Sequence, residues 1–87
     1  MITMWLLVEA EQGMFPDERT VVVRTADGGM VSLFVPDFKV RDRTGQSLIE
    51  VNVLDSTEQH SIVQLPAASI EGSSVARVDR SSLRTTA

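Results

Sequence analysis

The sequence predicts an all-β protein, a small antiparallel barrel or rolled sheet of five to six strands. Six short segments alternate apolar and polar residues with a period of two, which is typical of half-buried strands. Short connections rich in turn-forming residues separate them, and no window sustains a helical period. We expect a single barrel domain over residues 1–80, and a polar tail, residues 81–87, that frays.

Composition narrows the classes of function. The chain has 87 residues, 43% of them hydrophobic, which suffices for one core, and its net charge of −4 argues against nucleic acid as the partner. It has no cysteine to supply a disulfide or a thiolate ligand, and no cofactor or metal site is expected. The N-terminus lacks the basic leader of a signal peptide, and no stretch approaches the ~20 apolar residues of a membrane span. We therefore expect a cytoplasmic protein with no membrane partner.

The first strand is expected at residues 2–10. One of its faces carries four apolar side chains: Ile2, Met4, Leu6 and Val8. The other face carries Trp5 and Leu7, which also need cover because an exposed apolar patch marks an interaction site. A symmetric pairing of first strands, or of their faces, in a homodimer would bury both residues.

The second and third strands, residues 19–25 and 30–36, are predicted to form a hairpin. A two-residue primed turn at Asp27-Gly28 would place Val22 opposite Leu33 on the core face. Both faces of this hairpin are largely apolar, whereas an antiparallel strand usually has one wet face. Either the sheet closes on itself, with bent strands feeding the core through both faces, or a second chain covers it.

The remaining strands are expected at residues 47–55, 60–66 and 74–79, with one helical turn at 66–70. That turn before the last strand favours an SH3-like barrel over an oligonucleotide-binding barrel, which usually has a helix between its third and fourth strands. The residues predicted to be nearly fully buried are Val22, Leu33, Ile49, Val51, Val53, Val63 and Leu65.

Two groups of residues are candidates for partner contact. Met14 and Phe15 lie in the loop "GMFP", where they either plug the open end of the barrel or join Trp5 and Leu7 as a protein-contact surface. In the second group Lys39, Arg41 and Arg43 alternate, so an extended chain would project all three to one side. They would bind an anion or an acidic partner, or they form a solvated or protective charged edge.

His60 is the single histidine, and Asp55 and Glu58 precede it closely. Their spacing matches no established metal pattern, and a solvated turn is the simpler interpretation. The sequence thus favours a non-catalytic binding or assembly module that acts through protein–protein contacts, including self-contact in a homodimer, rather than an enzyme. The alternative is a small ligand-binding or hydrolytic barrel that uses these three polar groups.

Overall fold

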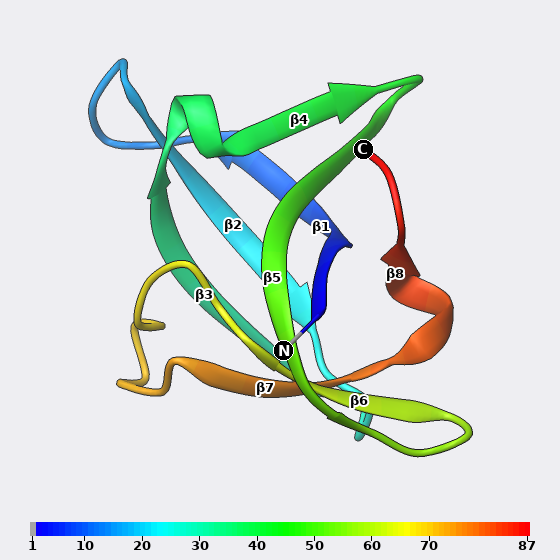
Figure 1. Ribbon diagram of the computed structural model, residues 1–87. Helices are drawn as coiled ribbons and strands as arrows, with labels where there is room; N and C mark the ends of the chain where they lie inside the picture. Colours follow the sequence, from blue (N-terminus) through cyan, green and yellow to red (C-terminus); the bar gives the residue numbers. More distant parts are fainter. Residues whose placement is uncertain (1) are drawn as a thin grey trace.

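The computed structural model describes residues 2–87 and consists of one strongly curled antiparallel sheet (Figure 1). Six strands form its path in the order β3-β2-β1-β5-β6-β7. Their bounds are β1 Ile2–Gln12, β2 Glu18–Arg24, β3 Met30–Pro36, β5 Gln46–Ser56, β6 His60–Gln64 and β7 Val75–Asp79. Off this path, β4 (Val40–Arg43) pairs with β5, and β8 (Leu83–Arg84) pairs with β1. The predicted all-β, barrel-like fold is confirmed.

The curl of the sheet brings its two edge strands, β3 and β7, toward each other (Figure 1). The loop between β6 and β7 spans the gap, since the Ile70 N–H donates to the Ser32 carbonyl over 2.7 Å and Leu33 bridges to Ser69. At the hairpin tip the Ala26 N–H donates to the Arg77 carbonyl over 2.9 Å. These contacts close a half-barrel around a single apolar interior.

The core fills the concave side of the curl and is built mainly from valine and leucine. Its best buried large side chains are Leu6, Val21, Val23, Leu33, Val35, Ile49, Val51, Val63 and Val78. The predicted burial of Leu33, Ile49, Val51, Val63 and Leu65 is confirmed. Val53 packs against the core but is only partly buried, because β5 has a bulge immediately after it.

The predicted hairpin register is wrong by one residue. Val21, not Val22, lies opposite Leu33, so Val21 is buried and Val22 is half-buried on the outer face. The turn is one residue longer than predicted, and only Gly28 adopts a positive φ, +87°, as in a three-residue loop with a glycine bulge. The Asp27 carboxylate holds this wider turn by accepting from the Thr25 hydroxyl and the Gly29 N–H.

The hairpin does not bury both of its faces. On the outer face Met30 and Phe34 are about half exposed, whereas Leu33 and Val35 enter the core and Val31 packs against it. From Val21 to Val23 in β2 and from Leu33 to Val35 in β3 the hairpin keeps one face inward, so the expectation that its bent strands would use both faces is wrong.

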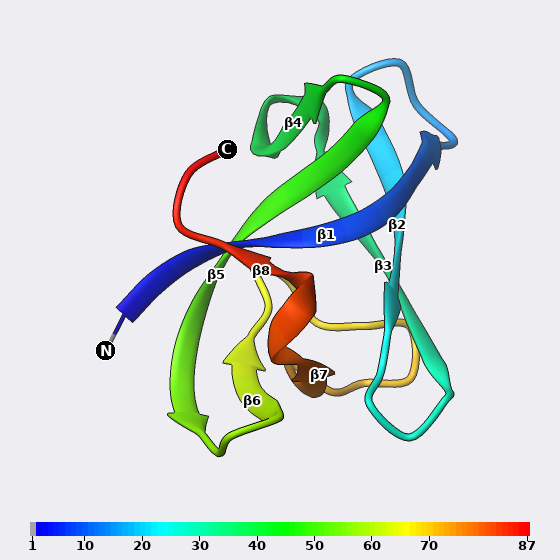
Figure 2. The same ribbon diagram turned by 90° about the vertical axis from the view of Figure 1, so that its right-hand side faces the viewer.

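Two local expectations also differ from the structure. Residues 66–70 contain no helix; the two 3₁₀ turns are η1 (Asp37–Lys39) and η2 (Arg80–Ser82). Part of the tail expected to fray is packed, because β8 lies against β1 (Figure 2) and pairs Leu83 with Leu6. The Leu83 side chain is buried.

Candidate functional site

The main candidate is an open groove of about 300 Å³ on the outer side of the sheet, where β1, η1, β4, β5 and the end of β6 meet. Trp5 lies opposite Glu50 in the pairing of β1 with β5, and the residues next to them in sequence, Leu6 and Ile49, are buried. Because side chains alternate along strands, Trp5 and Glu50 face outward. We call this hollow the Trp5 groove.

The lining of the Trp5 groove combines aromatic, amide and charged groups. Its ring-bearing side chains are Trp5, Phe38 and Pro66, and its amides are Asn52 and Gln64. Phe38 in η1 is 77% exposed and forms the rim. The groove thus offers apolar contact area beside hydrogen-bonding groups.

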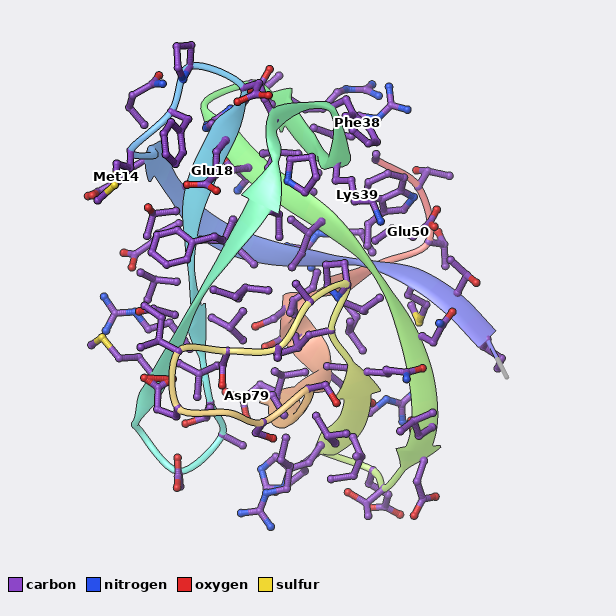
Figure 3. All side chains as sticks on the ribbon, turned by 90° about the vertical axis from the view of Figure 1, so that its left-hand side faces the viewer. Met14, Glu18, Phe38, Lys39, Glu50 and Asp79 are labelled. Atoms are coloured by element: carbon purple, nitrogen blue, oxygen red, sulfur yellow. The ribbon has the colours of Figure 1, made fainter. Side chains whose placement is uncertain are left out.

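Two cations lie at this groove. The Arg41 guanidinium carbon is 5.7 Å from the centroid of the Trp5 ring, within cation–π range. Lys39 lines the groove near Glu50 (Figure 3). Within residues 2–87 neither Lys39 nor Arg41 forms an ion pair. Both charges are therefore available to a partner.

An ionic cluster at Arg19 fixes η1 and β4, the elements that carry these cations. The Arg19 side chain is only 17% exposed and lies 3.3 Å from the Asp37 carboxylate and 3.2 Å from that of Asp42. Ser47 donates a further hydrogen bond of 2.8 Å to Asp42. The hydrogen bond from Arg19, followed by that from Ser47, lowers the pKa of Asp42.

A pH dependence follows from the lowered pKa of Asp42. Its contribution to stability is fully present above the ordinary carboxylate pKa of about 3.9 and is lost as the pH falls through the lower pKa of the folded state. In the Asp42→Asn variant the free energy of unfolding should therefore fall less steeply than in wild type below about pH 4. The total difference should stay below about 1 kcal/mol because the carboxylate is exposed. Urea unfolding across pH 2–7 measures this, with Glu58→Gln as a control that removes an unpaired carboxylate. Equal slopes for Asp42→Asn and wild type would contradict it.

The loop between β1 and β2 does not plug the barrel. Met14 and Phe15 are 83% and 59% exposed. The loop is nevertheless held at both ends, because the Gly13 N–H donates to the Glu18 carbonyl over 2.9 Å and the Asp37 N–H donates to the Asp17 carbonyl over 2.8 Å. It presents its apolar residues outward on an anchored turn.

The structure separates the remaining contact candidates from the Trp5 groove. Leu7 is half-buried and lies opposite Leu48, which is buried on the same outer face. Arg43 donates to the Ala87 carbonyl at the C-terminus rather than joining the other two cations. Of the predicted residues, Trp5, Lys39 and Arg41 come together.

The polar residues around His60 form a much smaller feature. His60 Nε2 lies 3.6 Å from Asp79 Oδ1, and His60 and Asp55 line a shallow pocket of about 70 Å³ that Glu58 does not reach. Ligand pockets are usually several times larger, roughly 300 Å³ or more. Among residues 2–87, no three His, Cys, Asp or Glu side chains cluster closely enough to hold a metal ion.

Sequence reasoning missed several residues of the groove, namely Phe38, Glu50, Asn52, Gln64 and Pro66. Alternation along 47–55 does place Glu50 and Asn52 outward. Their position beside Trp5 depends on the register of β1 against β5, which no local pattern encodes.

No known protein family, curated protein or solved structure matches this chain. Within the part of the chain that the structure describes, no helix has the length and apolar character needed to cross a membrane.

Proposed function

We propose that this chain is a non-catalytic binding and assembly module that captures an extended protein segment in the Trp5 groove. The observation that carries the proposal is the stacking of Arg41 on Trp5 at 5.7 Å beside an unpaired Lys39. Tryptophan and arginine are the residue types most enriched among those that dominate binding energy at protein interfaces.

The remaining lining supports an extended segment as the ligand. Asn52 and Gln64 project amides that both donate and accept hydrogen bonds, which suits the backbone of an extended peptide. Phe38 and Pro66 add apolar surface, and small barrels of the SH3 type bind extended peptides in grooves lined with aromatic residues. We also propose that the strands have an SH3-like arrangement and that the protein is cytoplasmic.

Charge favours an acidic segment. The whole chain carries −4, yet Lys39 and Arg41 outnumber Glu50 at the groove. A ligand with one or two carboxylates beside an apolar side chain would match both the cations and the rings. The alternative function is a ligand-binding or hydrolytic site at His60. The His60–Asp79 pair supports it, but the pocket there has a volume of only about 70 Å³.

Selection from a random peptide display library tests the proposal. We expect enriched peptides that pair an apolar residue with Asp or Glu, and the fluorescence of Trp5, the single tryptophan, should report their binding. Arg41→Glu should weaken binding at least about tenfold, whereas Arg77→Glu, an equal charge change on β7, should not. Peptides whose binding is insensitive to Arg41→Glu but lost in His60→Ala would overturn the proposal.

A further inference from the structure

We infer that the segment captured in the Trp5 groove is the β1–β2 loop, residues 13–17, of a second copy of this chain. The inference rests on the proposed function and names the partner of the same groove. The contact would form twice in a two-fold dimer, with each loop seated in the groove of the other copy.

The loop has the chemistry that the groove requires. Met14 and Phe15 are among the most exposed large apolar side chains of the described chain. Glu11 and Asp17 flank them, are exposed, and form no ion pair within residues 2–87. An apolar tip flanked by two carboxylates thus complements a groove that combines rings with two cations.

The loop is also preformed. Its ends are tied by the hydrogen bonds from Gly13 to Glu18 and from Asp37 to Asp17, and Glu18 N–H donates to the Phe15 carbonyl over 3.1 Å. Little backbone conformational freedom would be lost on docking, since the turn is already closed in the free chain.

The positions of loop and groove suit a two-fold interface. The Asp37 N–H bonded to the Asp17 carbonyl joins the loop to η1, whose Phe38 and Lys39 line the groove. In Figure 3 Met14 and Phe38 both lie in the upper part of the molecule, on opposite sides of it. A two-fold dimer uses one self-complementary patch on both copies, so the inference requires donor loop and acceptor groove to lie within one interface.

At the groove, the β1 strands of two copies cannot pair edge to edge. Trp5 pairs with Glu50 of β5 on one side and with Arg84 of β8 on the other. Self-association at the groove therefore has to use side chains. Such a contact is small, and small interfaces below about 1,200 Å² belong to weak complexes, so we expect a dissociation constant in the micromolar to millimolar range.

Sedimentation of charge-reversed variants tests the inference. The groove variant Lys39→Glu/Arg41→Glu and the loop variant Glu11→Lys/Asp17→Lys should each raise the dimer dissociation constant at least about tenfold, because each creates two repulsive contacts. An equimolar mixture of the two variants should dimerise again, since every loop then faces a groove of opposite charge. Misfolding cannot mimic this rescue. Failure of the mixture to dimerise, or a wild type that stays monomeric near 1 mM, would overturn the inference.

The fluorescence emission of Trp5 distinguishes failure of the dimer inference from failure of the proposed function. On dilution of wild type, the emission maximum should shift to the red with the midpoint found by sedimentation, as the loop of the second copy leaves the groove. A monomeric wild type whose Trp5 still responds to selected peptides would overturn the second copy as partner and leave the binding function standing. A Trp5 that responds to neither would overturn both.

Discussion

Leu33→Ala is expected to lower the free energy of unfolding by about 2–5 kcal/mol, the cost of emptying a well-packed leucine site. Leu33 is fully buried in the centre of β3 and lies opposite Val21 in β2. Both side chains enter the interior of the half-barrel. The neighbouring strands there cannot move freely to fill the cavity that truncation of Leu33 would create. Urea unfolding measures the change.

The adjacent valines of β2 provide a matched pair of controls for this prediction. Val21 is fully buried and Val22 is half-buried on the outer face. Val21→Ala should therefore cost about 1.5–3 kcal/mol and Val22→Ala less than about 1 kcal/mol. A larger cost at Val22 than at Val21 would show that the strand faces are reversed and the hairpin register is wrong.

Gly13→Ala is expected to cost about 1–3 kcal/mol, because an added methyl group has no room. A Cβ on Gly13 would lie 2.6 Å from the carbonyl oxygen of Glu18 and 2.8 Å from its carbonyl carbon. These are backbone atoms at the start of β2, so the loop would have to move away from the strand. Thermal unfolding of the variant measures the cost, and displacement of the loop should also weaken self-association.

Gly29→Ala is the control for this steric argument. A Cβ there would meet only the side-chain oxygens of Thr25 and Asp27, at 3.1 and 3.3 Å, which would have to shift by only a few tenths of an ångström. Its effect on stability should stay below about 1 kcal/mol. Equal losses for Gly13→Ala and Gly29→Ala would mean that the loop does not pack against Glu18 as described.

The strands of the sheet could be predicted from sequence because alternation is a local signal. Ile49 and Val51 alternate with Glu50 and Asn52, and the structure keeps them on opposite faces. The register of the hairpin could not be predicted, since it depends on how Thr25 and Asp27 hydrogen-bond inside the turn, and one extra turn residue exchanges Val22 for Val21.

The strand β8 was missed for a related reason. It contains only Leu83 and Arg84, too short for any period to appear, and it pairs the buried Leu83 with Leu6.

The candidate site was predicted only in its parts. Trp5 and the alternating cations Lys39 and Arg41 stand out in the sequence, but they lie more than thirty residues apart. Their meeting requires β5 to pair with β1 on one side and with β4 on the other, which brings the two segments onto one face. Arg43 continues the alternation, but its side chain donates a hydrogen bond to the Ala87 carbonyl at the C-terminus instead.

The central claim, that the Trp5 groove binds protein segments, is tested most directly by NMR of the uniformly ¹⁵N-labelled chain during titration with the strongest selected peptide. The account predicts that the indole N–H signal of Trp5 shifts together with the backbone amides of Lys39, Arg41, Glu50 and Asn52. Signals of Ser56, His60 and Arg77, which line the small pocket, should stay in place. Shifts confined to that second group, with the Trp5 indole signal unmoved, would contradict the account.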